Sequence, residues 1–271
     1  MSADASRPAA PSPDDGHTAA QVRAAEQPLL AAGEPLMQRA AAALADEIGR
    51  LLERETSVAR DAAAQPLVVV LAGSGDNGGD ALFAGAHLAE RGADVRIVAT
   101  GSRLHEAGAA AAHGAGATDL DPDADLEGFD RAVRDADVIV DGILGIGAAA
   151  SPALRGRSRD LVARVLEVLG PEWTERAGAA PRHPLVVAVD LPSGISPDDG
   201  AVPDPVVLPA DVTVTMGAVK AGLLRHPGAG YAGRVVLVDL GLGPALAGVQ
   251  PVARRWRRHD LPERGNPMRY G

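Results

Sequence analysis

The sequence predicts a doubly wound α/β domain with a mostly parallel sheet and helices ahead of its first strand. Its 271 residues suit one large α/β domain with short tails. From residue 66 onward, β-branched runs alternate with helical segments. Most of these runs are apolar at nearly every position, which is typical of strands that are buried on both faces of a parallel sheet.

Two helices are expected before the first strand. Residues 21–55 are rich in Ala and Leu, and Gly33 and Pro35 interrupt this stretch. From position 36 to position 48, an apolar residue recurs every four residues, as on one face of a helix. The preceding residues 1–20 are mostly Ala, Pro, Ser and Asp, a composition that predicts a disordered tail.

Six strands and three further helices are expected after residue 65. The strands are predicted at residues 67–72, 94–100, 137–145, 184–192, 211–216 and 234–240. A helix is expected from about Asn77 to Arg91, because a basic last turn and a glycine mark its end. Residues 101–120 and 151–169 are expected to be mainly helical. The domain is thus predicted over residues 21–246, and the Arg-rich residues 247–271 are interpreted as a solvated tail.

The composition excludes several classes of protein. The net charge is −10, and no basic stripe interleaved with aromatic residues occurs, so no nucleic-acid partner is expected. The chain has no cysteine, which excludes a disulfide framework and a cysteine nucleophile. It shows neither a secretory signal nor the roughly 18 consecutive apolar residues that span a bilayer. No membrane partner is therefore expected, and the cytoplasm is the predicted location.

A glycine-rich loop follows the first strand of the sheet. Gly73, Gly75 and Gly78 fit the G-x-G-x-x-G fingerprint of dinucleotide-binding folds, in which backbone N–H groups and a helix dipole face an anion. The ordinary fingerprint also has an acidic residue at the end of the next strand, which holds a ribose hydroxyl. Residues 98–103 contain no such residue, so the fingerprint alone does not establish a nicotinamide-dependent hydride transfer.

Three polar residues crowd the same loop. They are Asp76, Asn77 and Asp80. One of them could cap the helix that follows, as Asp and Asn often do. A single cap does not account for all three, so their side chains are interpreted as placed for a ligand.

Two later strands also end in polar residues. Asp141 ends one strand, and Asp190 and Ser193 end the next. Because the carboxyl ends of parallel strands line one ligand crevice, these loops are expected to converge with the glycine-rich loop. Oxygen donors from Asn77, Asp141 and Ser193 would suit a hard cation rather than zinc.

These motifs carry a family resemblance. Residues 73–80, 141–147 and 189–194 resemble, in order, the G-x-G-[ND]-N-G-G-D, D-x-x-x-G-x-G and V-D-x-P-S-G motifs of the NAD(P)H-hydrate epimerase family. Members of this family also form the N-terminal domain of bifunctional nicotinamide-nucleotide repair proteins. Lys220 and residues 233–241 follow in family order.

The resemblance implies a three-layer Rossmann-like fold and an isomerase of metabolite repair, which interconverts the R and S forms of hydrated NADH or NADPH. It places this small-molecule substrate against two loops and against Asp190. The loop residues that it implies are Asp76, Asn77, Gly78, Gly79, Asp80, Gly145, Ile146, Gly147, Ala148, Ala149, Ala150 and Ser151. A homodimer is implied as well.

The resemblance further implies one potassium ion per subunit, held by Asn77, Asp141 and Ser193. Asp190 is predicted to be the general acid/base, because inversion of a carbon that bears a hydroxyl next to a ring nitrogen requires proton transfer at oxygen. Lys220 would stabilise the ionised form of Asp190 or orient the substrate. Alternatively, Lys220 is a surface lysine that follows an edge strand.

Two other functions stay open at this point. A non-catalytic nucleotide-binding or scaffolding protein would keep the same fold, and an NADP-dependent oxidoreductase would use the literal fingerprint. The oxidoreductase ranks last, because the chain has no Tyr-x-x-x-Lys pair and no evident second substrate domain. Bifunctional family members continue into a dehydratase domain, so residues 247–271 are alternatively a truncated linker to such a domain.

Overall fold

The architecture is organised around a seven-stranded parallel sheet. A computed structural model describes residues 10–59, 65–175 and 184–255. The strands are β2 (Leu67–Ala72), β3 (Asp94–Ala99), β4 (Thr118–Asp119), β5 (Val138–Gly142), β6 (Leu185–Val189), β7 (Val212–Met216) and β9 (Arg234–Val238). They lie in the order β4-β3-β2-β5-β6-β7-β9, and every neighbouring pair is parallel. The strand order reverses between β2 and β5, as in a doubly wound fold.

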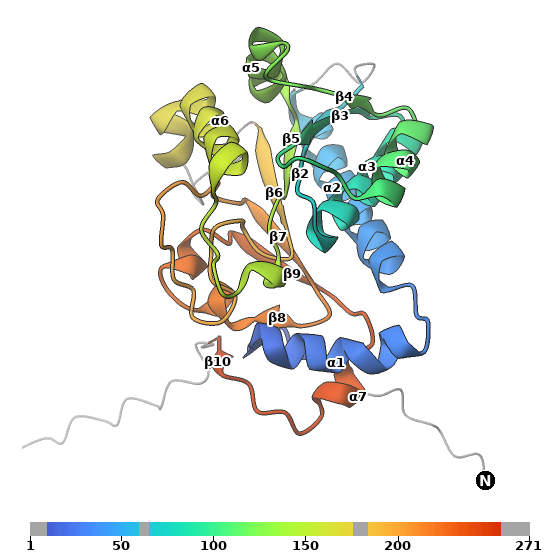
Figure 1. The fold of residues 1–271 in the computed structure, drawn as a ribbon, viewed down its shortest axis with the longest axis vertical. Helices are drawn as coiled ribbons and strands as arrows, with labels where there is room; N and C mark the ends of the chain where they lie inside the picture. The colour runs from blue at the N-terminus through green and yellow to red at the C-terminus, as the bar shows by residue number, and fades with distance from the viewer. Residues whose placement is uncertain (1–9, 60–64, 176–183, 256–271) are drawn as a thin grey trace, which may run out of the picture.

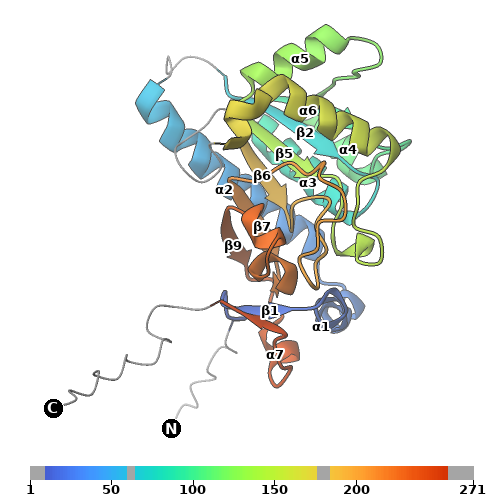
Figure 2. The same ribbon diagram turned by 90° about the vertical axis from the view of Figure 1, so that its left-hand side faces the viewer.

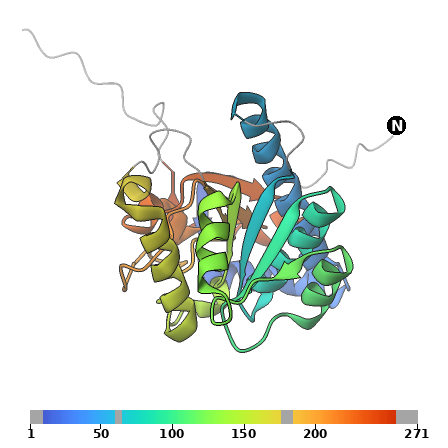
Figure 3. The same cartoon turned by 90° about the horizontal axis from the view of Figure 1, so that it is seen from above.

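Helices cover both faces of this sheet (Figures 1 and 3). One layer consists of α2 (Leu36–Ala59), α3 (Asp76–Glu90) and α4 (Glu106–Gly114), and the other consists of α5 (Leu126–Asp135) and α6 (Gly156–Glu175). Successive residues of a strand point to opposite faces. Val68 and Val70 of β2 therefore pack with the first layer, whereas Val69 and Leu71 pack with the second. The predicted three-layer α/β fold is confirmed.

The two helices expected before the first strand are α1 (Ala19–Ala31) and α2, and they have different surroundings. Thr18 and Gln21 form a capping box at the start of α1. The backbone N–H of each residue donates a hydrogen bond to the side-chain oxygen of the other residue. Val22 and Ala25 of α1 pack against residues that follow β7 and β9, including the short helix α7 (Gly243–Leu246). Figure 1 shows α1 at the same end of the molecule as β8, beyond the sheet, whereas α2 covers a face of the sheet.

A second, smaller sheet joins both ends of the described chain. In it, β1 (Asp15–His17) pairs antiparallel with β10 (Ala253–Arg254) and parallel with β8 (Val219–Lys220). Figure 2 shows β1 close to α1 and α7, at the end of the molecule opposite α5. The prediction of a disordered tail over residues 1–20 is therefore wrong for residues 15–20, because backbone pairing and a capped helix order them. The tail predicted over residues 247–271 likewise contains a strand, while residues 1–9 and 256–271 lie outside the described residues.

The remaining differences from the sequence prediction concern single elements. Helix α6 begins at Gly156 rather than at residue 151, and α5 was not expected. The segment 101–120, expected to be mainly helical, forms α4 only over residues 106–114 and ends in the unexpected strand β4, which pairs with β3. Short 3-10 helices occur at η1 (Ile146–Ala148), η2 (Ala221–Leu224) and η3 (Gly228–Gly230). In the part of the chain that the structure describes, no helix has both the length and the apolar character needed to cross a membrane.

The packing of α2 on the sheet leads to a stability prediction. Leu44 is fully buried between α2 and the sheet, so Leu44→Ala should leave a cavity and lower the free energy of unfolding by about 2–5 kcal/mol. Leu30 is 51% exposed, so Leu30→Ala should change the free energy of unfolding by less than about 0.5 kcal/mol. Urea unfolding of both variants checks this, and equal effects would contradict the assigned packing.

Candidate active site

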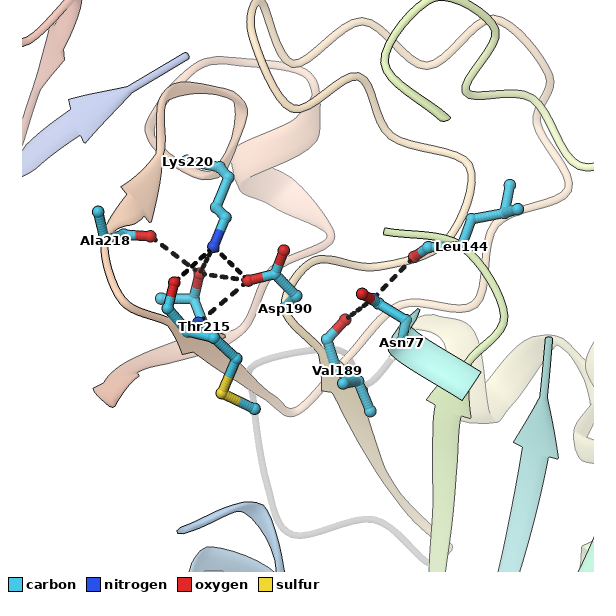
Figure 4. Close-up of polar contacts among 8 residues, drawn as sticks. Asn77, Leu144, Val189, Asp190, Thr215, Ala218 and Lys220 are labelled. Atoms are coloured by element: carbon cyan, nitrogen blue, oxygen red, sulfur yellow. Dashed lines mark hydrogen bonds and ion pairs between the residues drawn. The ribbon is translucent and has the colours of Figure 1, made fainter. Parts of the chain in front are cut away.

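Asn77 connects the loops that follow three strands. It lies in the first turn of α3, and its Nδ2 donates to the carbonyl oxygens of Leu144 (3.1 Å) and Val189 (2.6 Å) (Figure 4). Leu144 follows β5 and Val189 ends β6. A side chain on Gly145 would place its Cβ 2.1 Å from Oδ1 of Asn77, so only glycine fits there. The expected convergence of these loops is confirmed.

Asp141 and Ser193 form a buried hydrogen-bonded pair beside Asn77. The Ser193 hydroxyl donates to Oδ1 of Asp141 (2.6 Å), and the Ser193 backbone N–H donates to Oδ2 (2.8 Å). The N–H of Leu144 donates to Oγ of Ser193 (2.9 Å), which links this pair to the carbonyl that Asn77 binds. Burial raises the pKa of the Asp141 carboxyl, although these hydrogen bonds act in the opposite direction. Among the described residues, no lysine, arginine or histidine pairs with it.

Asp190 and Lys220 form a buried ion pair at the end of β6. The side chains are 6% and 1% exposed, and Nζ of Lys220 donates to Oδ1 of Asp190. The same oxygen accepts hydrogen bonds from the backbone N–H of Met216 (3.0 Å) and the hydroxyl of Thr215 (3.3 Å). Lys220 also donates to the Met216 carbonyl (2.7 Å). The interpretation of Lys220 as a surface lysine is therefore wrong.

Two details of Asp190 are typical of a functional group. Within the described residues, it is the one non-glycine residue with a positive φ, at 69°. Such strained backbone is concentrated at active sites. In addition, Oδ2 of Asp190 accepts no hydrogen bond from the described residues, and Figure 4 shows it pointing away from Lys220. One carboxylate oxygen is thus fixed by the protein and the other is left for a ligand.

The glycine-rich loop presents backbone rather than a side-chain cap. Helix α3 begins after Gly75, which makes no side-chain capping bond, so neither Asp76 nor Asn77 has the predicted alternative role as a cap. A Cβ on Gly73 or Gly78 would lie 2.0 Å from a backbone oxygen, whereas Gly75 has open space beside it. The loop is therefore closely packed on one side and open on the other, where an anion can approach the helix N-terminus.

Two arginines donate hydrogen bonds to the second predicted loop, residues 145–151. Nη2 of Arg23 donates to the carbonyl oxygen of Ile146 (2.5 Å), and Nη2 of Arg155 donates to Oγ of Ser151 (2.5 Å). Arg23 comes from α1 and lies outside the motifs that predicted the site from the sequence. The sequence signal for Arg23 is that it and Glu26 are polar residues in an Ala-rich helix. Because they are three residues apart, they lie on one face of this helix.

The side chains of Asp76 and Asp80 face a cavity on the other side of the glycine-rich loop. This cavity has a volume of about 300 Å³, and Glu26 of α1 is its third acidic lining residue. Its apolar lining residues are Leu30, Leu36, Met37, Ala40, Met216 and Leu240. Asp80 is 8% exposed, and its buried Oδ1 has no hydrogen-bond partner within residues 10–59, 65–175 and 184–255. Burial, followed by the charges of Asp190 and Asp76, raises the pKa of Asp80 well above its usual range, and burial also raises the pKa of Glu26.

Comparison with known proteins indicates the family of this chain. Residues 33–222 match the family described as YjeF-related protein N-terminus. A protein of Clavibacter michiganensis called NAD(P)H-hydrate epimerase is 50% identical over 248 residues, which cover 90% of this chain and 96% of the relative. The bifunctional NAD(P)H-hydrate repair enzyme Nnr of Mycobacterium tuberculosis is 38% identical over 245 residues, which cover 87% of this chain and 44% of that enzyme. The class is thus a Rossmann-like α/β domain of the YjeF-related type.

The chain belongs to the NAD(P)H-hydrate epimerase family. The resemblance inferred from the three motifs is confirmed. The crystal structure of yeast YNL200c superimposes with a TM-score of 0.62 at 18% identity, covering 82% of this chain and 86% of that one. At this identity the yeast structure supports the fold alone.

The unpartnered carboxyl of Asp80 leads to a prediction of pH-dependent stability. When the folded pKa of an aspartate is raised, stability falls as the pH rises from the ordinary Asp range through the folded pKa, because the unfolded chain releases its proton first. Asp80→Asn should therefore raise the free energy of unfolding by about 1–3 kcal/mol at about pH 7.5, and much less below about pH 4.

Urea unfolding at the two pH values checks this prediction. Asp160→Asn is the matched control, because Asp160 is exposed on α6. A stabilisation by Asp80→Asn that is equal at both pH values would contradict the assigned burial of the charge.

Proposed function

We propose that this chain interconverts the R and S epimers of hydrated NADH or NADPH, as an isomerase of metabolite repair. The observation that carries the proposal is the buried Asp190–Lys220 pair at the end of β6, with one carboxylate oxygen left for a ligand. The network of Asn77, Asp141 and Ser193 lies directly beside it. The names of the relatives, NAD(P)H-hydrate epimerase and bifunctional NAD(P)H-hydrate repair enzyme, support the same substrate.

We place the nucleotide across the carboxyl edge of the sheet, which is the side where the parallel strands have their carboxyl ends. The backbone N–H groups of residues 76–78, in the first turn of α3, and the guanidinium groups of Arg23 and Arg155 would bind its phosphates, because both sites favour anions. The hydrated ring would then lie toward Asp190. The side chains of Asp76 and Asp80 line the acidic cavity, so we assign the phosphates to the loop backbone rather than to these carboxylates.

Asp190 is the proposed proton carrier. Inversion either opens the ring at the C–N bond and recloses it on the other face, or loses water and adds it back on that face. In the first route the hydroxyl loses its proton and the ring nitrogen gains one, and in the second the hydroxyl gains a proton as it leaves. Both routes move a proton at the hydroxyl oxygen and restore it after inversion, so neither has a net redox change. Lys220 compensates the charge of Asp190 in a site that excludes water.

The donors around Asn77 fit a potassium ion. Asp141 is a fully buried carboxylate without a cationic partner among the described residues, and Ser193 adds a hydroxyl. The amide of Asn77 and the carbonyls that it contacts add further oxygens, and oxygen donors suit a hard cation. A bound ion would supply positive charge next to the substrate. One ion per subunit, a homodimer, the cytoplasmic location and the lack of a nucleic-acid partner remain predictions.

The catalytic assignment is tested by Asp190→Asn. This variant should lower the rate of epimer equilibration by at least about 100-fold, because it removes the proton carrier. It also leaves the buried charge of Lys220 uncompensated, at a cost in stability of about 3–5 kcal/mol. NMR spectroscopy of a single hydrated NADH epimer, mixed with each variant, measures the equilibration rate.

A double variant separates loss of chemistry from loss of folding. Asp190→Asn combined with Lys220→Met removes both charges, so it should recover stability but not activity. A normal equilibration rate in either variant would overturn the role of Asp190. If the wild-type chain binds the nucleotide but does not speed epimer exchange, a non-catalytic nucleotide-binding function is correct instead, and hydride transfer would identify an oxidoreductase.

The potassium site is tested by exchanging the cation. Potassium chloride, compared with tetramethylammonium chloride at equal ionic strength, should increase the equilibration rate and raise the free energy of unfolding by about 1–3 kcal/mol. Asp141→Asn should abolish both responses, whereas Asp160→Asn on the exposed face of α6 should keep them. A wild-type protein that is indifferent to the cation would exclude the site.

A further inference from the structure

The acidic cavity adjoins the catalytic ion pair. Met216 lines the cavity, and its backbone N–H donates to Oδ1 of Asp190 (3.0 Å). The charges of Asp190 and Lys220 act on both Glu26 and Asp80. The cavity therefore lies next to the proposed proton carrier, although Glu26 lies outside the three sequence motifs.

The chemistry of the cavity disfavours phosphate. Three carboxyl groups line it, and no arginine or lysine is among its described lining residues. The nearest guanidinium groups described above lie over residues 145–151 instead. The site thus has a basic side at that loop and an acidic side at the cavity, so an elongated ligand with phosphates at one end is oriented by charge.

The cavity suits a small, uncharged ring with hydrogen-bonding groups. About 300 Å³ is at the lower end of ligand pockets, and apolar side chains make up much of the wall. The buried Oδ1 of Asp80 has no partner in the described part of the chain, and a buried polar atom of this kind is costly unless a ligand pairs with it. A hydrated nicotinamide ring carries an amide group and a hydroxyl, which are partners for such carboxyl groups.

We propose that this cavity holds the hydrated nicotinamide ring, and that Glu26 of α1 and Asp80 of α3 determine specificity by hydrogen bonding to its polar groups. This inference rests on the function proposed above and deepens it. The raised pKa values of both carboxyls are consistent with an uncharged acid that donates as well as accepts. Helix α1 therefore completes the substrate site, with Arg23 toward the phosphate side and Glu26 toward the ring.

The test compares two probes that differ by the ring. Binding of a hydrated NADH epimer and of ADP-ribose, which lacks the ring, is measured by calorimetry for the wild type, Glu26→Gln and Asp80→Asn. Each substitution should weaken binding of hydrated NADH about tenfold, because one carboxyl oxygen is replaced by an amide nitrogen that cannot accept a hydrogen bond. Binding of ADP-ribose should stay unchanged, since this probe lacks the ring that the two carboxyl groups contact. Glu90→Gln, on the exposed end of α3, is the matched control and should behave as the wild type with both probes.

The outcomes separate this inference from the proposed function. If the wild type equilibrates the epimers but both variants bind hydrated NADH normally, the cavity does not hold the ring and the inference is wrong. If the variants lose affinity for both probes equally, the cavity holds another part of the nucleotide and the inference is also wrong. If folded variants lose affinity for hydrated NADH but not for ADP-ribose, the inference is supported. This holds even if the wild type does not equilibrate the epimers and the proposed function is wrong. Thermal unfolding establishes that the variants are folded.

Discussion

The common direction of the seven main strands is the constraint on which the site depends. Parallel strands end at the same edge, so the loops after β2, β5 and β6 must meet there. Asn77 uses this proximity, because one amide group binds carbonyls from two of these loops. Gly145 permits the close approach, since any Cβ at that position would overlap Asn77. The hydrogen bonds of one side chain thus set the relative positions of the glycine-rich loop, the loop after β5 and the end of β6.

The same edge holds three buried carboxyl groups, whose surroundings differ. Asp190 has an ammonium partner, and Asp141 has a hydroxyl and backbone N–H groups. The buried Oδ1 of Asp80 has no hydrogen-bond partner among the described residues. Because an uncompensated buried charge is costly, the three residues differ in what they can bind. Asp141 suits a cation, Asp190 suits proton transfer, and Asp80 suits a ligand that brings hydrogen-bonding groups with it.

Helix α1 gives the site its electrical polarity. It lies across the carboxyl edge rather than on a face of the sheet, and the small sheet of β10, β1 and β8 anchors the segment before it. Its Arg23 contacts the loop at Ile146, while its Glu26 lines the cavity with Asp76 and Asp80. A ligand with phosphates at one end and an uncharged ring at the other therefore has one favourable orientation.

The sequence by itself determined the main sheet, most of its helices and the central residues of the site. Continuous apolar runs specify buried parallel strands, and polar residues at the strand ends must converge because the strands are parallel. The sequence did not reveal α5, the small sheet, Arg23 or Glu26, or the burial of Lys220. Helix α5 does have local signals, namely the Asp125 cap and the apolar residues Phe129 and Val133 at helical spacing. The other features depend on contacts between distant parts of the chain, such as Gly16 with Val219 and Arg23 with Ile146, for which local periodicity carries no signal. Only tertiary structure, in which α1 covers the edge of the sheet, decided which side of the site is acidic and which is basic.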